Sequence, residues 1–319
     1  MEKNPGLCEG SEMPAFELEV SDGDAGERLD VVLARRVPGL SRGRARALLE
    51  AGRVRVGGRL VKKSYLLQEG DRVTLDLLPG PADFHATPDP ELPLEILLET
   101  ESFVVVDKPA GVPSHPLEEG ERGTLAGALV ARYPEMRGVG YRRREPGIVH
   151  RLDTDTSGVM LAARTAEAFR ALREDLRAGR IEKRYLARCV GVVSAPSIIE
   201  IPIASDPRDS RKVRACTDER EAKRLRARPA RTEVISSKPA PHGSLVEVRA
   251  NHARRHQIRV HLASIGHPLL GDTLYGGPRL DHPDRHLLHA VSLKIGTLSI
   301  TTSAWNHEAS DVKIAASDH

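Results

Sequence analysis

The sequence has few cysteines, few aromatic residues and no long apolar run, and each shortage excludes a class of protein. Only 3 of its 319 residues are cysteines, and none forms a Cys-x-x-Cys pair. Disulfide frameworks and cysteine-based zinc sites are therefore poor interpretations, and a reducing compartment fits. Aromatic residues make up 3% of the chain, which argues against an open stacking platform for single-stranded nucleic acid. No stretch approaches the roughly 20 apolar residues of a membrane span.

The remaining composition is that of a globular protein with local basic clusters. Hydrophobic residues make up 39% and charged residues 29%, which suffices for a packed core. The first residues lack the apolar core of an export signal, so we expect a cytoplasmic protein. Net charge is only +3, but arginines cluster at 42–59, 142–144 and 208–231. Such clusters are the electrostatic footprint of a phosphate backbone, although each one alone also fits a solvated face. Nothing indicates an oligomer, so we expect a monomer.

Composition changes along the chain predict five segments. Residues 1–24 are polar and glycine-rich, and we expect a flexible N-terminus. A compact unit follows at 25–78, and the proline-dense stretch 79–93 is typical of a linker. Residues 94–300 form the large domain, and 301–319 are expected to be a weakly ordered tail.

The unit at 25–78 has the pattern of two helices followed by a hairpin. The first helix begins in Glu27-Arg28-Leu29-Asp30, and Ser41 caps a second one that stops at Gly52. Gly57-Gly58 is a hairpin signal, and a strand follows Gly70-Asp71. The order of these pieces resembles the S-four-like RNA-binding domain, named after the fourth small-subunit ribosomal protein; a generic small α+β module is the alternative. The resemblance implies RNA contact for the arginines of the second helix and hairpin: Arg42, Arg44, Arg46, Arg53 and Arg55.

The large domain mixes strand and helix patterns. A helix is predicted at 165–179, where Thr165 is the cap, Phe169, Leu172 and Leu176 form the apolar stripe, and Gly179 ends it. Residues 205–230 are polar, basic and interrupted by proline, so we expect a long loop there. The other predicted elements are strands at 96–100, 103–109, 157–164, 184–193 and 244–250, and a helix at 256–266. The fold class is α+β.

The stretch VHRLDTDTSG at 149–158 is the most informative for chemistry. A calcium loop that starts at Asp153 would need glutamate at its twelfth position, and that residue is Arg164, so calcium is rejected. Asp155 fits a turn residue. From its residues alone, Asp153 is either a turn residue or a catalytic carboxylate in a tight polar loop.

Four blocks in one order favour catalysis, because together they resemble the RluA family of pseudouridine synthases. The match covers about residues 94–295, and HRLDTDTSGVML reproduces that family's signature nearly residue for residue. The other blocks are DKPAGVPSHP at 107–116, EKRYLA at 182–187 and HQIRVHLASIGHPLLGDTLYG at 256–276. The family's usual Thr-Gly-Arg-Thr run is replaced here by His252-Ala253-Arg254-Arg255, which keeps only the arginine and loses a glycine that can set the turn.

The resemblance implies a mixed, mainly antiparallel sheet of the pseudouridine synthase type, and it assigns roles to four residues. Asp153 attacks the ribose or takes its 2′ proton, Arg259 pairs with Asp153, and Tyr185 stacks under the uracil. Arg151 fills the gap left by a uridine flipped out of the RNA. Lys108 and His150 are interpreted as structural or RNA-contact residues.

No cofactor and no metal are expected. The histidine pairs four residues apart lack the glutamate of a zinc protease helix, and the chain has neither a Walker loop nor a dinucleotide fingerprint.

The predicted function is isomerisation of uridine to pseudouridine in RNA. By resemblance, members with this N-terminal appendage modify large-subunit ribosomal RNA. The alternatives are a transfer-RNA pseudouridine synthase, a non-catalytic RNA-binding or ribosome-assembly protein, and an RNA glycosidase that releases uracil.

Overall fold

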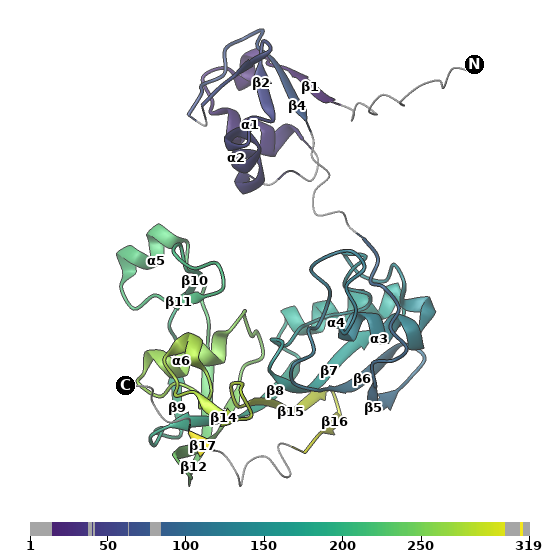
Figure 1. Cartoon of the computed structure of the whole chain (residues 1–319), viewed down its shortest axis with the longest axis vertical. Coiled ribbons are helices and arrows are strands. Elements are labelled where there is room, and N and C mark those ends of the chain that lie inside the picture. Colours follow the sequence, from purple (N-terminus) through teal and green to yellow (C-terminus); the bar gives the residue numbers. More distant parts are fainter. Residues whose placement is uncertain are drawn as a thin grey trace, which may run out of the picture. The chain divides into compact units, whose positions relative to one another are not determined.

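The structure is a computed structural model that describes residues 15–37, 40, 42–62, 64–76, 84–303 and 313–314. The chain divides into two compact units, residues 1–82 and 83–319, which carry different colours in Figure 1. Each unit has its own hydrophobic core.

The N-terminal unit is a four-stranded antiparallel sheet with two helices packed on it. The helices are α1 (Leu29–Arg36) and α2 (Arg42–Glu50), and a 3₁₀ turn, η1, spans Asp22–Asp24. Leu29, Leu33 and Leu75 are fully buried between helices and sheet. The strand order is β1 (Ala15–Glu19), β4 (Arg72–Asp76), β2 (Val54–Val56), β3 (Arg59–Leu60).

The predicted flexible N-terminus was wrong from residue 15 onward. Ala15–Glu19 forms β1, which pairs antiparallel with β4. The reason is a period of two: apolar Phe16, Leu18 and Val20 alternate with Glu17 and Glu19, and this pattern lets one face of a strand join the core. Val20 is 2% exposed and Leu18 packs against the core. Residues 1–14 lie outside the described part.

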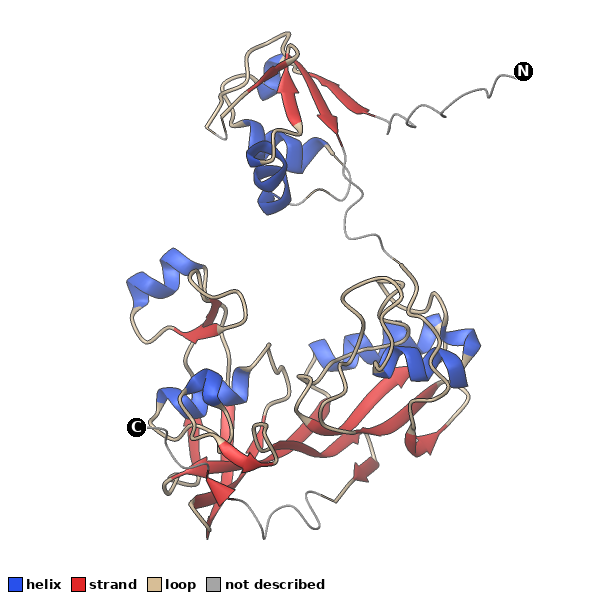
Figure 2. Cartoon of the chain, viewed as in Figure 1, coloured by secondary structure: helices blue, strands red, loops and turns tan. Residues whose placement is uncertain are grey.

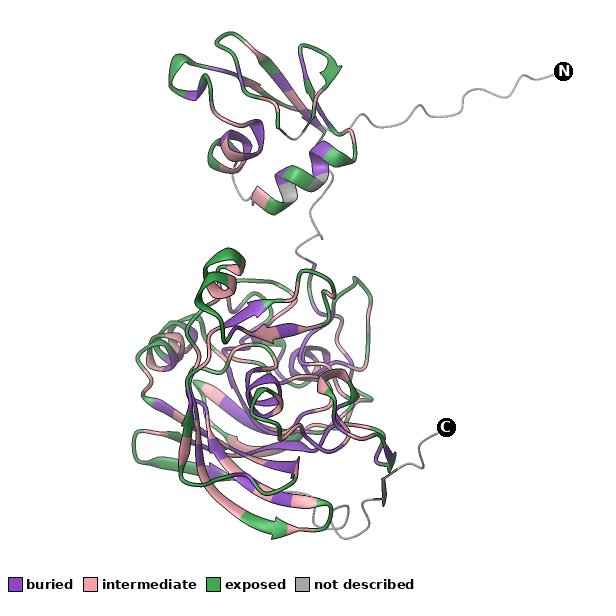
Figure 3. Ribbon diagram, turned by 90° about the vertical axis from the view of Figure 1, so that its left-hand side faces the viewer, coloured by how far each residue is buried: buried purple, intermediate pink, exposed green. Residues whose placement is uncertain are grey.

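The second unit is built on one nine-stranded sheet. Every neighbouring pair of strands is antiparallel except β7 and β15, which run parallel. This confirms the predicted mixed, mainly antiparallel sheet. Buried and intermediate residues alternate along some of its strands, as in Gly243–Arg249, whereas Ser157–Ala163 is buried at every position after the first (Figure 3). The order is β5 (Glu95–Glu99), β6 (Phe103–Lys108), β7 (Ser157–Ala163), β15 (Leu288–Ile295), β8 (Ile181–Val190), β13 (Gly243–Arg249), β12 (Thr232–Ala240), β9 (Ser197–Ile199), and β16 (Leu298–Thr301) pairs with β15.

Three helices cover this sheet, and strand alternation decides which face each one covers. α3 (Leu125–Arg132) and α6 (Gln257–Ser264) share one core with the side chains of Val104 and Val106. α4 (Ala166–Arg177) packs with Val105 in another. Figure 2 shows α3 and α6 over different halves of the sheet, with loops between them. The predicted cap and stripe of α4 are confirmed: the Thr165 side chain accepts a hydrogen bond from the Ala168 amide, and the three stripe residues are buried.

The predicted loop at 205–230 was wrong. It contains α5 (Glu219–Leu225) and, with flanking residues, the hairpin β10 (Ile203–Ser205) and β11 (Val213–Ala215). Asp218 caps α5 through the Glu221 amide, a local signal masked by the charged composition. No residue of α5 is buried. The remaining elements are η2 (Pro134–Met136), η3 (Thr273–Tyr275), β14 (Leu280–His282) and β17 (Lys313–Ile314).

The predicted linker and the predicted tail both differ from expectation where the structure describes them. Residues 84–93 were expected to be linker, yet Phe84 and Ala86 are buried in the second unit and Asp89 accepts a hydrogen bond from the Gly123 amide. Prolines made this stretch extended without keeping it away from the core. In the predicted tail, Lys313–Ile314 pairs with β14, and most of the rest lies outside the described residues.

One glycine of the signature is fixed by backbone packing. Gly158 pairs with Ala290 at the parallel contact of β7 and β15 and has φ of +113°. A Cβ atom there would lie 2.3 Å from the Ala290 carbonyl oxygen. Only glycine therefore lets the two strands approach at the place where the signature loop enters the sheet.

Candidate active site

The signature loop, residues 150–156, is held by the block at 107–116. Lys108 is fully buried at the end of β6, and its Nζ donates to the carbonyls of Pro109, Val112 and Thr154 at 2.7–2.9 Å. Ser114 Oγ donates to the Leu152 carbonyl and accepts from the Leu152 amide. Burial lowers the pKa of Lys108 to about 7. These contacts fix the backbone on both sides of Asp153.

His150 pins the start of the same loop to the sheet. Its Nε2 accepts a hydrogen bond from the Leu161 amide on β7, so the proton of the neutral ring is on Nδ1. Burial, with the charges of Lys183 and Arg173, lowers the pKa of His150 to about 3. A structural role fits His150, as it fits Lys108.

The carboxylate of Asp153 lies against the guanidinium of Arg259, 106 residues further along the chain. Arg259 Nη1 donates to Asp153 Oδ2 at 3.0 Å. The other two nitrogens of Arg259 donate to Asp272, Nε at 2.7 Å and Nη2 at 2.9 Å. Asp272 thus binds the guanidinium in a bidentate manner and orients Nη1 toward Asp153.

This carboxylate–guanidinium–carboxylate set is largely sealed from water on one side. The side chains of Arg259 and Asp272 are 8% and 1% exposed, whereas that of Asp153 is 23% exposed. Burial opposes the charge of Arg259, but the hydrogen bond and charge of Asp272 and the charge of Asp153 raise its pKa well above the usual range. Asp153 is therefore the only member of the three that an incoming molecule can reach easily.

Tyr185 closes the floor beside Asp153. It lies on β8, is 4% exposed, and shares a cavity of about 40 Å³ with Asp153, Thr156 and Leu288. Burial and the nearby charge of Asp153 both raise the pKa of Tyr185, so the phenol stays protonated. The structure thus brings Asp153, Tyr185 and Arg259 together, as the resemblance implied.

A larger groove opens from this cavity. It has a volume of about 790 Å³, and its lining includes Asp153, Arg151, Arg259 and Asp272. Arg151 is exposed and its Nη1 lies 3.2 Å from His115 Nε2. The Arg151 side chain is therefore positioned at the mouth of the site, next to Asp153 and not inside the core.

Sequence reasoning missed three residues around the Asp153–Arg259 ion pair. Asp272 grips Arg259, Tyr275 lies under the guanidinium with 5.2 Å between Arg259 Cζ and the ring centre, and His256 Nδ1 lies 2.8 Å from the Tyr275 hydroxyl. Asp272 and Tyr275 both fall in the block GDTLYG. The only sequence signal for them was membership of that block, because no local pattern says which partner they face.

The altered run at 252–255 does not strain the turn. The residue with a left-handed backbone before α6 is His256, with φ of 53°, and Ala253 has no positive φ. Loss of the family's glycine at that run is therefore tolerated. His256 Nε2 lies 3.8 Å from Asp153 Oδ2, so the residue that follows the run places an imidazole at the site.

Acid is expected to destabilise the protein through His256. Burial and the charges of Arg259 and Arg255 outweigh Asp153 and lower the pKa of His256 from 6.5 to about 4. Between these pH values the unfolded chain binds a proton that the folded chain does not, so the free energy of unfolding falls as pH falls, by about 2 kcal/mol from pH 7 to pH 5. His256→Asn should lose this contribution to the pH dependence of stability, because asparagine does not titrate. The variant should still fold, since asparagine tolerates the left-handed backbone. Urea denaturation at both pH values measures it.

The control for this prediction is His252→Asn. His252 is exposed, and its replacement should leave the pH dependence as in the wild type. An equal loss of stability on acidification in wild type and His256→Asn would contradict the assignment.

The five arginines predicted in the N-terminal unit divide into two groups. Arg42 and Arg46 donate to Asp30, at 2.9 and 2.6 Å, and Arg28 donates to the same carboxylate. Burial raises the pKa of Asp30, but the three hydrogen bonds hold it well below the usual range. Arg53 and Arg55 are exposed on and beside β2. The side chain of Arg44 lies outside the described part.

Three arginines on one buried carboxylate leave a positive surplus at the surface. The side chains of Arg28, Arg42 and Arg46 are 39–45% exposed although they share Asp30. Their first role is structural, because Asp30 ties α2 to the start of α1. Their outward faces still present positive charge.

The described residues lack two kinds of structural feature. They contain no group of three or more His, Cys, Asp or Glu that could hold a metal ion. They also contain no helix of the length and apolar character needed to cross a membrane.

A small unit with exposed arginines and, in the second unit, a carboxylate–arginine site together indicate the class of RNA-modifying enzymes. Residues 102–264, about half of the chain, match the family model described as RNA pseudouridylate synthase, and residues 27–73 match the S4 domain. The chain belongs to the RNA pseudouridylate synthase family, whose members convert uridine in RNA to pseudouridine. The predicted enzyme class, the RNA partner and both resemblances are thereby confirmed.

Individual relatives are consistent with that membership. An uncharacterized RNA pseudouridine synthase of Chloroflexus aurantiacus is 39% identical over 277 residues, which cover 84% of this chain and 81% of the relative. A ribosomal large subunit pseudouridine synthase D of Xylella fastidiosa is 37% identical, over 81% of this chain and 74% of the relative. The solved structure of human RNA pseudouridylate synthase domain containing 1 superposes with a TM-score of 0.55 at 25% identity, covering 72% of this chain and 93% of that one.

Proposed function

We propose that this enzyme isomerises uridines of large-subunit ribosomal RNA and that Asp153 is its catalytic carboxylate. The observation that carries the proposal is the hydrogen bond from Arg259 Nη1 to Asp153 Oδ2, while Nε and Nη2 of Arg259 donate to Asp272. A carboxylate held this way keeps its charge and its aim while one side stays open to substrate.

Asp153 acts where positive charge develops on the ribose. Isomerisation breaks the glycosidic bond, turns the uracil over and rejoins it through carbon 5. Bond breaking makes the sugar electron-poor, and a fixed carboxylate stabilises that state, as in glycoside hydrolysis. Asp153 does so either by attacking the ribose or by taking its 2′ proton.

Tyr185 and the closed floor handle the detached base. A uracil against the Tyr185 ring stacks on an apolar face, and the protonated hydroxyl is near the carbon that must lose a proton. The small cavity behind Asp153 has no room for bulk water. Excluding water protects the electron-poor sugar from hydrolysis until the base rejoins, which separates an isomerase from a glycosidase.

Arg151 accounts for the position of the nucleotide. The target must leave the RNA stack to reach Asp153. Arg151 lies at the mouth of the groove, and its planar guanidinium stacks on bases and bonds phosphate. We assign it the place vacated by the uridine.

The N-terminal unit supplies further phosphate contacts. We assign RNA binding to Arg42, Arg44, Arg46, Arg53 and Arg55, supported by the exposed arginines of the hairpin and by the surplus charge around Asp30. We take the first compact unit, residues 1–82, as the RNA-binding domain and the second, residues 83–319, as the catalytic domain. Binding through such contacts falls steeply with salt.

The ribosomal substrate is supported by relatives named for the large ribosomal subunit. A cytoplasmic location fits that substrate, and we propose that the chain acts as a monomer.

Mapping pseudouridines in a deletion strain tests the substrate. Specific large-subunit sites should lose the modification, regain it with the wild-type gene, and stay unmodified with Asp153→Ala. Transfer RNA from the same cells is the second pool. Loss confined to transfer RNA would overturn the ribosomal assignment, and no loss in either pool would overturn the function itself.

A further inference from the structure

A second groove has Asp153 but not Asp272 in its lining. It has a volume of about 680 Å³, and its lining also includes Lys183, Asn251 and His150, with Glu145 as a further carboxylate. Cations dominate its walls, among them Arg173, Arg177, Arg228 and Arg254. It shares Asp153 and Arg151 with the substrate groove, so whatever fills it lies next to the extruded nucleotide.

Lys183 is the unusual member of this groove. The residue is 6% exposed, and its backbone is engaged: the amide donates to Asn251 Oδ1 and the carbonyl accepts from the Ala250 amide. Among the described residues, no side chain or carbonyl accepts a hydrogen bond from its ammonium group. Within the described ranges no carboxylate forms an ion pair with its ammonium group. A buried lysine without a counter-ion is costly and is rare in proteins unless something else supplies the negative charge.

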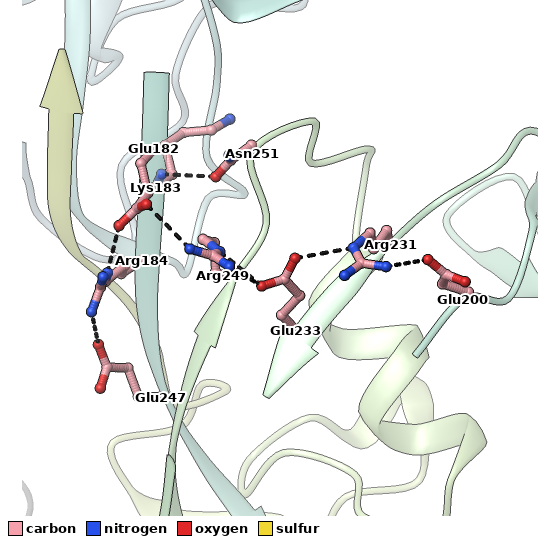
Figure 4. A network of polar contacts seen from close by, with 9 residues as sticks. All are labelled: Glu182, Lys183, Arg184, Glu200, Arg231, Glu233, Glu247, Arg249 and Asn251. Carbon is pink, nitrogen blue, oxygen red and sulfur yellow. Dashed lines mark hydrogen bonds and ion pairs between the residues drawn. The ribbon is translucent and has the colours of Figure 1, made fainter. Parts of the chain in front are cut away.

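The neighbouring carboxylates are already engaged on the other face of the strand. Glu182 bonds Arg184 and Arg249, and Glu247 bonds Arg184 (Figure 4). In Figure 4 the ion-pair chain continues to Arg231 and Glu200. The single dashed line at Lys183 is the hydrogen bond from its backbone amide to Asn251 Oδ1. Alternation along β8 therefore sends the ion pairs to one face and Lys183 to the other.

That other face is the face of the active site. Burial alternates along β8, with Ile181, Lys183, Tyr185 and Ala187 on the buried side. Lys183 and Tyr185 are two residues apart, which places their Cα atoms roughly 7 Å apart along the strand. A base resting on Tyr185 would have part of its own backbone within reach of Lys183.

The electrostatics around Lys183 also favour an anion. Burial lowers its pKa to about 8, and no neighbouring carboxylate raises it. Burial and the charge of Arg228 both lower the pKa of Arg254, which shows like charges crowded together. An anion between them would relieve both effects.

We propose that this groove is a phosphate-binding subsite, in which Lys183 binds a backbone phosphate beside the extruded uridine and Arg228 and Arg254 contact the same stretch of RNA. The inference rests on the proposed function, because the anion is the RNA itself. Lys183 is thus a substrate-binding residue, distinct from the Asp153 set. A single phosphate contact of this kind adds a defined share to the salt dependence of RNA binding.

Steady-state kinetics on unmodified transcripts of large-subunit ribosomal RNA, labelled with tritium at uridine carbon 5, test the subsite. Lys183→Met should raise KM about tenfold with kcat within about threefold, and should reduce the slope of log(kcat/KM) against log salt by about 0.7–0.9. Lys183→Arg should restore both values. Lys238→Met, which removes an exposed charge from β12, is the matched control and should change neither.

A second variant covers the case in which Lys183→Met does not fold. Arg228 is exposed, and within the described part of the chain its side chain forms no hydrogen bond or ion pair. Arg228→Gln should therefore fold and should reduce the salt slope in the same direction. Unchanged KM and slope in folded Lys183→Met and in Arg228→Gln would overturn the subsite, as would a loss confined to kcat. A wild type that releases no tritium would instead count against the proposed function, and the salt slope of binding to the same transcripts would then decide the subsite.

Discussion

Asp153→Asn is expected to abolish isomerisation while RNA binding stays intact. Loss of an essential nucleophile or base lowers kcat by about 10⁴-fold or more in other enzymes. The asparagine side chain keeps the size of the carboxylate and can still accept from Arg259, so the fold and the groove should persist. Tritium release measures the activity, and filter binding at fixed salt measures RNA affinity, which we expect to stay within about threefold.

The matched control is Asp155→Asn, two residues away in the same loop. Asp155 is half-buried, and Arg259 Nη1 donates to Asp153 and not to Asp155. Replacing Asp155 should therefore leave kcat within about tenfold. An Asp153→Asn enzyme with kcat near wild type would remove Asp153 from the chemistry. A large loss of RNA affinity would make its role one of binding.

Asp272→Asn is expected to damage stability and activity together. Asp272 is 1% exposed and gives Arg259 two of its three hydrogen bonds. Asparagine can accept from only one of the two Arg259 nitrogens that Asp272 engages, so one buried guanidinium donor loses its partner while Asp153 remains as the counter-ion. We expect the free energy of unfolding to fall by about 2 kcal/mol. The guanidinium would also lose its aim, so we expect kcat to fall by about 100-fold. Urea denaturation and tritium release measure the two effects.

Two comparison variants separate stability from positioning. Asp284→Asn breaks an exposed pair with Arg279 and should shift stability by less than about 0.5 kcal/mol. Asp272→Leu combined with Arg259→Met removes both charges and should recover part of the stability without recovering activity. If Asp272→Asn unfolds like the wild type, the pair does not stabilise the fold. If it keeps full kcat, Asp272 does not position Arg259.

Local patterns predicted the elements whose signals are short-range. Helix α4 follows from a cap at Thr165 and an apolar stripe at Phe169, Leu172 and Leu176, both present in one segment. Composition misled where it outweighed such signals: α5 lies in a highly charged stretch but has its own cap at Asp218, and β1 lies in a polar N-terminus but alternates correctly. The alternation of β1 and the cap of α5 are local signals from which both elements could have been predicted.

The candidate site was predictable only in part. The signature at 149–158 pointed to Asp153, and the resemblance supplied Tyr185 and Arg259 from distant blocks. Asp272 had no such prediction, because its meaning depends on which guanidinium it faces. The linker at 79–93 failed for a related reason: proline predicts extended chain but not whether that chain packs, and Phe84 packs.

By itself the sequence determined the enzyme family, the two-part organisation and the carboxylate that we propose as catalytic, because these are written in contiguous motifs. Only the tertiary structure decided that Asp272 holds Arg259 toward Asp153, that Asp30 gathers three arginines, and that Lys183 lies buried beside the site with no counter-ion among the described residues. A charge acquires its pKa and its role from neighbours brought together by folding, and those neighbours lie up to 106 residues away along the chain.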